Sequence, residues 1–168
     1  MAEMWGLCDK DGNPTTKTVQ RFQKIPEGYY HKIVHLCILN SEGKLLSQQR
    51  SANKYSFPLY WDVTVGGSSI LNENENQAMT RELKEELGID INFSNISPIF
   101  LIKGNNYLDY WFFIKYDVDL DKLKLQKEEV IDVAYYTVQQ VERLISENKF
   151  IDYLYSDMIK NVISMMFE

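Results

Sequence analysis

Apolar and polar positions alternate in short blocks along this chain, and the first clear blocks predict a pair of strands. His31–Leu39 is rich in apolar residues, and Leu45–Arg50 follows it after the turn-forming segment Asn40–Lys44. Two apolar runs joined by a short segment rich in Asn, Ser and Gly are typical of a β-hairpin. We therefore predict a hairpin over residues 31–50.

The middle of the chain predicts four more strands. Each is a short run rich in apolar and aromatic residues and is bounded by residues that favour turns. The expected strands are Trp61–Val65, which Gly66 and Gly67 would end, then Pro98–Lys103, Tyr107–Tyr116 and Val130–Tyr136. The second and third of these would pair around Gly104, Asn105 and Asn106.

Three segments predict helices. Asn74–Leu87 contains neither Pro nor Gly, has apolar residues at helical spacing, and precedes Gly88, a residue typical of helix ends. Thr137–Ser146 and Asp152–Met166 are amphipathic at helical spacing. Locally paired strands with one helix between them and two at the end favour an α+β (mixed α/β) fold over a doubly wound sheet.

Length and composition favour a single globular domain. The chain has 168 residues, of which 45% are hydrophobic and 25% charged, which is typical of a protein with one sizeable core. No repeat, low-complexity tract or long linker interrupts it. We expect one domain over residues 1–168.

Charge and cysteine content exclude several classes of partner. A net charge of -6 disfavours binding to polymeric nucleic acid or to anionic membranes. Met1–Lys10 lacks the pattern of a signal peptide, and no stretch reaches the ~18 apolar residues of a membrane span. Cys8 and Cys37 are far apart in sequence, so buried thiols are expected in place of a disulfide framework or zinc site. A cytoplasmic location follows by default.

One stretch carries much more specific chemistry. Residues 67–89 read Gly67-x5-Glu73-x7-Arg81-Glu82-Leu83-x-Glu85-Glu86-x-Gly88-Ile89. Because a helix advances about 100° per residue, Glu82, Glu85 and Glu86 gather on one side of the predicted helix. Met79, Leu83 and Leu87 form the adjacent apolar stripe.

A salt-bridged helix surface is the alternative interpretation of these charges, because Arg81 and Glu85 have the spacing of an ion pair. It explains neither the like-charged Glu82 and Glu86, which repel each other at four-residue spacing, nor Glu73 and the Gly-Gly pair before the helix. A divalent ion would relieve that repulsion, and carboxylate oxygens are ligands that magnesium and manganese prefer.

The stretch resembles the Nudix box, the catalytic motif of Nudix hydrolases. The resemblance implies an α/β/α sandwich with a mixed sheet, and a pyrophosphohydrolase that uses Mg²⁺, for which Mn²⁺ can substitute. The implied metal ligands are the carboxylates of Glu82, Glu85 and Glu86 and the carbonyl of Gly67, and Glu73 would pair with Arg81 to hold the loop. The implied reaction is attack by water at phosphorus of a small-molecule substrate, a nucleoside diphosphate linked to another moiety.

The proton acceptor has several candidates, because members of that family take it either from the box or from a later loop. Glu82 and Glu85 are the candidates in the box. Asp109, inside an apolar strand, and the pair Glu128 and Glu129 are candidates outside it. For each of these last three, an ordinary solvent-facing acid is the alternative.

Residues outside the box resemble the branch that contains isopentenyl-diphosphate isomerase and its hydrolase relatives. The resemblance rests on the strand from His31, on Gln48 to Ser51, and on Lys54 and Trp61. It places Arg50 and Lys54 near the substrate phosphate, with plain surface solubility as the alternative. Nearby aromatic residues would stack on a base or else fill the core, namely Tyr55, Phe57, Tyr60 and Trp61.

The chain differs from the isomerases at the positions of their catalytic residues. The isomerase cysteine before the second box glycine and the metal-binding histidine after it are replaced by Gly66 and Ser68. His31 matches an isomerase metal ligand, although a lone histidine that opens a strand is more often structural. Hydrolysis is therefore favoured over an isomerase-like enzyme. A non-catalytic nucleotide-binding module is a third reading, but such modules tend to lose box acids, and this chain keeps them all.

Overall fold

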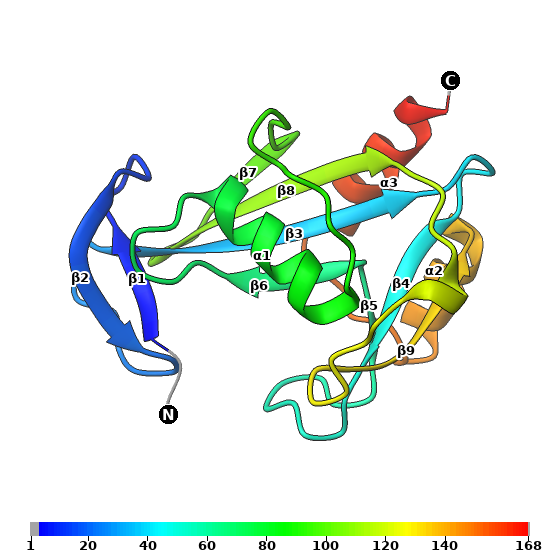
Figure 1. The fold of residues 1–168 in the computed structure, drawn as a ribbon, viewed down its shortest axis with the longest axis horizontal. Coiled ribbons are helices and arrows are strands. Elements are labelled where there is room, and N and C mark those ends of the chain that lie inside the picture. Colours follow the sequence, from blue (N-terminus) through cyan, green and yellow to red (C-terminus); the bar gives the residue numbers. More distant parts are fainter. Residues whose placement is uncertain (1–3, 168) are drawn as a thin grey trace. The chain divides into compact units, whose positions relative to one another are not determined.

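The computed structural model describes residues 4–167, which form nine strands, three α-helices and one short 3-10 helix (Figure 1). The strands are β1 Met4–Cys8, β2 Pro14–Gln20, β3 Tyr30–Leu39, β4 Leu45–Arg50, β5 Trp61–Asp62, β6 Val65–Ser68, β7 Phe100–Lys103, β8 Tyr107–Lys115 and β9 Val130–Tyr136. The helices are α1 Glu75–Leu87, α2 Val138–Ser146 and α3 Ser156–Met166, and the 3-10 helix is Leu120–Lys122.

Hydrogen bonds join the strands in the order β2-β1-β3-β4-β5, with β6 and β8 also paired to β3, β7 paired to β8, and β9 paired to β4. The strand pairs β1–β2, β3–β4, β4–β9 and β7–β8 are antiparallel, and Trp61 forms an isolated parallel bridge with Phe150. A mixed sheet with helices between and after its strands confirms the predicted α+β class.

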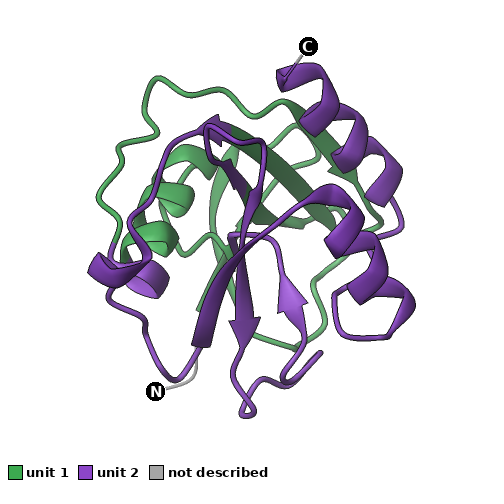
Figure 2. Ribbon diagram, turned by 90° about the vertical axis from the view of Figure 1, so that its right-hand side faces the viewer, with its two compact units in different colours: residues 1–36, 66–84, 89–113 green, residues 37–65, 85–88, 114–168 purple. Residues whose placement is uncertain are grey.

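The described chain divides into two compact units, coloured separately in Figure 2. The first contains residues 4–36, 66–84 and 89–113, and the second contains residues 37–65, 85–88 and 114–167. Strand β3 and helix α1 each run from one unit into the other without a break. Helix α1 therefore contributes Glu82 to the first unit, and Glu85 and Glu86 to the second.

The core of the first unit forms around the first part of α1. Ala78, Met79 and Leu83 are fully buried there, as are Phe93 and Trp111. Strand β7 pairs with β8 over the register Phe100 with Trp111 to Lys103 with Leu108, while β1 pairs with β2 and with the start of β3. The apolar stripe predicted for the helix is thus the stripe that it buries.

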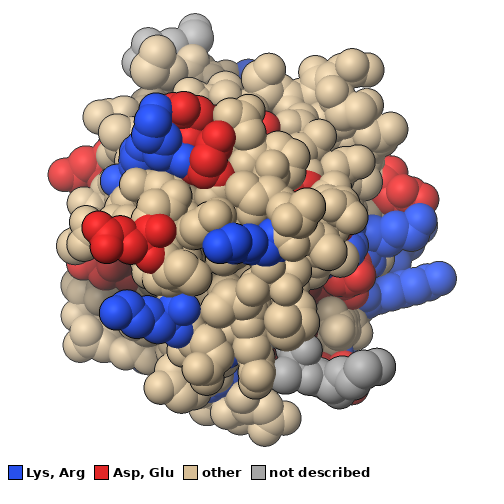
Figure 3. All heavy atoms as spheres, turned by 90° about the vertical axis from the view of Figure 1, so that its left-hand side faces the viewer, with Lys and Arg blue, Asp and Glu red and all other residues tan. Residues whose placement is uncertain are grey.

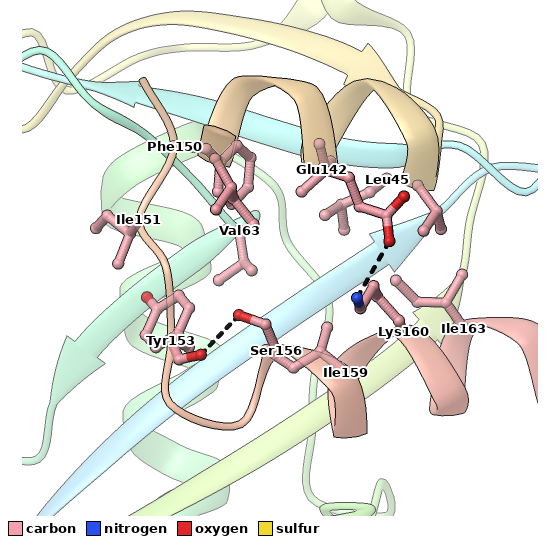
Figure 4. A pocket seen from close by; sticks show the side chains of 13 residues that line it. Leu45, Val63, Glu142, Phe150, Ile151, Tyr153, Ser156, Ile159, Lys160 and Ile163 are labelled. Atoms are coloured by element: carbon pink, nitrogen blue, oxygen red, sulfur yellow. Dashed lines mark hydrogen bonds and ion pairs between the residues drawn. The ribbon is translucent and has the colours of Figure 1, made fainter. Parts of the chain in front are cut away.

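Strand β4 organises the second unit. It pairs antiparallel with β5 and along its length with β9, and its first residues pair with the end of β3. Helix α2 starts at Thr137, whose side chain forms a reciprocal capping box with Gln140. Side chains of α2 and α3 line an apolar cavity together with Val63 and Phe150 (Figure 4). At about 30 Å³ this cavity has room for little more than one water molecule, so we place no substrate there.

Most predicted elements are confirmed to within two residues at each end. One correction concerns Gly66 and Gly67, which lie inside β6 and do not end a strand. Both adopt strand conformation, and neither has a positive φ angle. A β-carbon on Gly66 would lie 3.0 Å from the ring of His35, and one on Gly67 would overlap Glu82. These glycines permit close packing of side chains against the strand.

Three further differences from the predicted elements are local. Strands β1 and β2 were not predicted, because β2 is mostly exposed and lacks a run of apolar residues. Helix α3 begins at Ser156 and not at Asp152, because Ile151 is bonded to the Trp61 carbonyl and the Ser156 N–H closes a turn onto Tyr153. The Trp61–Val65 strand is also shorter than expected, since β5 ends at Asp62.

Charges of both signs lie on the surface, and both cysteines are buried. No helix within residues 4–167 is both long enough and apolar enough to cross a membrane. On the face drawn in Figure 3, acidic and basic side chains are interspersed in small groups. Cys8 and Cys37 are both buried as free thiols, as predicted.

Candidate active site

The loop between β6 and α1 leads into a well-capped helix. The Asn74 side chain accepts a hydrogen bond from the Gln77 N–H at 2.8 Å, and the Gln77 side chain accepts one from the Asn74 N–H at 2.9 Å. This reciprocal pair satisfies two donors at the start of the helix. Helix α1 can therefore begin immediately after the loop that contains Glu73.

Arg81 joins that loop to the helix. Its Nε and Nη2 donate to the two carboxylate oxygens of Glu73 at 2.7 and 2.9 Å, a bidentate geometry, and Nη2 also donates to the Ser68 carbonyl at 3.0 Å. Bidentate charge-assisted bonds fix both orientation and distance. The structure thus brings Glu73 and Arg81 together across the loop.

Glu82 lies against the strand that precedes the loop. Its Oε1 is 3.0 Å from Nη1 of Arg81 and accepts a weak hydrogen bond of 3.3 Å from the Ser68 N–H. A β-carbon at Gly67 would overlap the Glu82 carboxyl group. Only glycine at position 67 lets this carboxylate approach the backbone there.

Glu85 and Glu86 lie one turn further along α1 and differ in exposure. Glu85 is exposed, whereas Glu86 is 5% exposed and accepts a hydrogen bond of 3.0 Å from Nε2 of Gln48. The backbone carbonyls of Glu86 and Leu87 accept from the N–H groups of Gln126 and Lys124, each at 3.0 Å. The end of the helix is therefore held by the segment before β9, and Gly88 follows it with φ of 72°.

The chemistry of these donors fits a hard divalent cation. Three carboxylates at helical spacing and one backbone carbonyl are oxygen ligands of the kind that Mg²⁺ and Mn²⁺ prefer. Among the described residues, no three His, Cys, Asp or Glu side chains lie close enough together to hold a metal ion.

Arg50 and Lys54, the two predicted phosphate ligands, contact other residues of the second unit. The Arg50 side chain is 12% exposed, donates from Nε and Nη2 to the Ser56 carbonyl at 3.2 and 3.0 Å, and contacts Asp62 at 3.3 Å. Lys54 forms an ion pair with Glu129. The Lys54 side chain is 13% exposed, so most of its surface is covered, as it is for Arg50.

The loop that Arg50 holds carries exposed aromatic side chains. Tyr55 is 82% exposed and Phe57 is 48% exposed, so neither fills the core. Tyr60 contacts Phe57 edge to face, whereas Trp61 packs on Tyr136 with ring centroids 5.0 Å apart. Phe57 and Leu59 have φ angles of 48° and 65°, which non-glycine residues rarely adopt.

The acids outside the box have distinct surroundings. Asp109 is 2% exposed and lies 2.7 Å from Nδ1 of His35, whose ring stacks on Trp111. Glu129 pairs with Lys54, and Glu128 is exposed, with its carbonyl bonded to the Ser51 hydroxyl. His31 stacks on Trp5 at 4.0 Å between ring centroids. A buried, histidine-paired Asp109 favours a structural role for that carboxylate.

The sequence analysis assigned no role to three polar residues that contact the predicted ones. Gln48 bonds to Glu86, Asp62 bonds to Arg50 and Tyr153, and His35 bonds to Asp109. Each of the three is a polar residue within or beside an apolar strand, where a buried polar group needs a hydrogen-bond partner. The neighbouring sequence does not indicate which residue is the partner, because the partners are 12 to 91 residues away.

Comparison with protein families gives one match over most of the chain. The model described as NUDIX domain matches residues 29–158. An uncharacterized Nudix hydrolase of Listeria innocua is 40% identical over 169 residues, covering 98% of this chain and 99% of that protein. Isopentenyl-diphosphate Delta-isomerase I of Camptotheca acuminata is 31% identical over 156 residues, covering 80% of this chain and 65% of that protein.

Comparison with solved structures supports the same fold. The crystal structure of DR0079 from Deinococcus radiodurans matches with a TM-score of 0.75 and 18% identity, covering 95% of this chain and 98% of that one. The crystal structure of a MutT protein from Methanosarcina mazei matches with a TM-score of 0.62 and 20% identity, covering 86% and 99%.

Proposed function

This chain belongs to the Nudix family and is a pyrophosphohydrolase, and we propose that it hydrolyses a nucleoside diphosphate linked to another moiety in a magnesium-dependent reaction. Hydrolysis of nucleoside diphosphate derivatives is the general chemistry of the family. The observation that carries the more specific proposal is the intact set of box acids on α1, beside a loop fixed by the bidentate Arg81–Glu73 pair. We propose that residues 1–168 act as one catalytic domain.

Each box residue has a separate task in this proposal. The carboxylates of Glu82, Glu85 and Glu86 and the Gly67 carbonyl would hold Mg²⁺, or Mn²⁺ in its place. The bound ion would supply neutralisation of the diphosphate oxygens and orientation of a water molecule for in-line attack. Arg81 and Glu73 keep the Gly67–Ser68 backbone and α1 in one fixed arrangement.

Removal of a proton from the attacking water needs a carboxylate that water can reach. Glu85 is exposed on α1, and we assign the role to it, with Glu82 as the second candidate within the box. Asp109 is buried against His35, which makes it less suited to accept a proton from solvent, and Glu128 and Glu129 are the candidates outside the box that are not buried.

Substrate binding is assigned to the loop between β4 and β5. Lys54 would bind a phosphate oxygen by exchanging Glu129 for the substrate, while Arg50 holds the loop through Ser56 and Asp62. The exposed rings of Tyr55 and Phe57 are suited to stack on a base, which typically contributes ~1–3 kcal/mol and is indifferent to base identity. Use of several nucleotides is therefore expected.

Isomerisation of isopentenyl diphosphate is the second candidate, favoured by the similarity to plant isomerases. It requires a side chain that protonates and deprotonates carbon, and Gly66 offers none. A β-carbon at position 66 would lie 3.0 Å from the ring of His35, which is a tight contact. We therefore expect no dimethylallyl diphosphate from purified protein.

A substrate panel tests this proposal. Purified protein is incubated with Mg²⁺ and with nucleoside diphosphates, nucleotide sugars, dinucleotides, diphosphoinositols or isopentenyl diphosphate, and the phosphate-containing products are resolved by chromatography. We expect nucleoside monophosphate from several nucleotide substrates. Cleavage of non-nucleotide diphosphates alone, or formation of dimethylallyl diphosphate, would contradict the proposed substrate class.

A further inference from the structure

Gln48 is a buried polar residue that the proposed chemistry has not used. It lies on β4, where it pairs with Asp62 of β5 and with Val133 of β9 in the strand register, and it is 3% exposed. Its side-chain amide donates a hydrogen bond from Nε2 to Oε2 of Glu86 at 3.0 Å, with both residues in the second unit. A buried amide pays a desolvation cost that such a bond must offset.

The partner of Gln48 is held at its backbone as well. The Glu86 carbonyl accepts from the Gln126 N–H at 3.0 Å, so the position of the residue on α1 is fixed independently of its side chain. The amide of Gln48 then restricts the rotation of the Glu86 carboxylate. Because glutamine carries no charge, this contact orients the carboxylate without neutralising it, in contrast to the Arg81 contact with Glu82.

We propose that Gln48 is a positioning residue for the metal site: its amide fixes the orientation in which Glu86 presents its carboxylate to a divalent cation. The inference rests on the proposed function, because it needs Glu86 to be a ligand. Groups that orient ligands in this way typically change metal affinity by ~10–100-fold when they are removed. Glu86, and not Gln48, would contact the metal ion.

The test compares two glutamines on neighbouring positions of one strand. Gln48→Met keeps the length of the side chain and removes the amide, and Gln49→Met makes the same change at a partly exposed residue whose Nε2 bonds to the Leu59 carbonyl. Binding of Mn²⁺ to each folded variant is measured by the loss of the electron paramagnetic resonance signal of free Mn²⁺. We expect about tenfold weaker binding for Gln48→Met and unchanged binding for Gln49→Met.

A double-mutant cycle separates positioning from general damage to the fold. In a Glu86→Gln background, Gln48→Met should cause no further loss of Mn²⁺ affinity, because the oriented carboxylate is already gone. Wild-type affinity of a folded Gln48→Met protein, or additive losses in the double variant, would overturn the inference. Circular dichroism and urea unfolding establish that each variant is folded.

The remaining outcomes also decide between positioning and a purely structural role. If Gln48→Met does not fold, Gln48→Asn keeps an amide but withdraws it by one methylene, and weaker Mn²⁺ binding by that variant would support positioning. Failure of both variants to fold would make Gln48 a structural requirement and overturn the inference. Unchanged Mn²⁺ affinity of Glu86→Gln would contradict the proposed metal site itself, whereas a loss confined to Glu86→Gln would contradict only the role of Gln48.

Discussion

Arg81 uses its guanidinium group to connect the loop, the strand and the helix of the proposed site. Its bonds to both oxygens of Glu73 and to the Ser68 carbonyl need donors at fixed angles, which the planar guanidinium supplies and a lysine ammonium does not. Arg81→Lys should therefore keep the charge and the fold but lower kcat/KM by about 10- to 100-fold, because charge-assisted bonds are each worth about 1.5–3 kcal/mol. Steady-state hydrolysis of a substrate found with the panel measures this.

A matched substitution controls for loss of arginine as such. Arg143 on α2 forms an exposed ion pair of 2.8 Å with Glu147, an arrangement that contributes little to stability. Arg143→Lys should leave kcat/KM unchanged. Equal rates for Arg81→Lys and wild type would show that the bidentate geometry is unimportant for catalysis.

Residues differ in how far their roles follow from sequence. The pairing of Glu73 with Arg81 was expected from the family pattern and lies within eight positions of chain. The partners of Gln48 and Asp62 were not expected, because they come from elements 38 and 91 positions away. Arg50 is predicted to lie near a phosphate, and its contacts with the Ser56 carbonyl and with Asp62 were not expected from the sequence.

Elements of the fold show a similar contrast, and the hairpin β1–β2 is the main example. Helix α1 was predictable because apolar residues at four-residue spacing leave one buried stripe. Strand β2 was not, since most of its residues are exposed and its place is set by pairing with β1. That pairing places Gly6 against the loop that leads to Glu73, where the Gly6 N–H donates to the Ser69 carbonyl at 3.2 Å.

The hairpin therefore braces the loop of the proposed site, and Gly6→Ala tests this contact. A β-carbon at Gly6 would lie 2.6 Å from the Ile70 carbonyl oxygen and 2.9 Å from the Leu71 Cα, both of them backbone atoms. Because these backbone atoms cannot move away without distorting the loop, we expect a loss of about 1–3 kcal/mol in the free energy of unfolding and a lower kcat. Urea unfolding and steady-state kinetics measure the two effects.

The register partner of Gly6 provides the control. Thr18 lies opposite Gly6 on β2 and is exposed, so Thr18→Ala changes the hairpin without approaching the loop. We expect a change within ~0.5 kcal/mol, as for most surface substitutions. Similar stability of Gly6→Ala and Thr18→Ala would mean that the hairpin does not brace the loop.

For the whole molecule, the reactivity of each cysteine thiol can show when its own unit unfolds. Cys8 lies in the first unit and Cys37 in the second, and burial raises the pKa of each thiol, that of Cys37 well above its usual value. Both thiols should therefore be slow to react with a disulfide reagent until the surrounding structure opens. Their reactivity can show whether residues 1–168 unfold as one domain.

The measurement uses two variants that each keep a single thiol, Cys8→Ala and Cys37→Ala, labelled at increasing urea concentrations. If the chain is one cooperative domain, each remaining thiol should become reactive in parallel with the loss of circular dichroism of its own variant. Labelling of one thiol at clearly lower urea than global unfolding would indicate that its unit opens by itself. The prediction of a single domain would then be wrong.

The magnesium dependence of hydrolysis, measured for Glu86→Gln beside Glu42→Gln, tests the central claim most directly. Glu86 is a proposed ligand on α1, whereas Glu42 is an exposed acid in the turn between β3 and β4, paired with Lys44. We predict that EDTA abolishes wild-type hydrolysis and added Mg²⁺ restores it, that folded Glu86→Gln loses at least ~100-fold in rate, and that Glu42→Gln keeps the wild-type rate. Full magnesium-dependent activity in Glu86→Gln, or wild-type hydrolysis that persists in EDTA, would contradict the account.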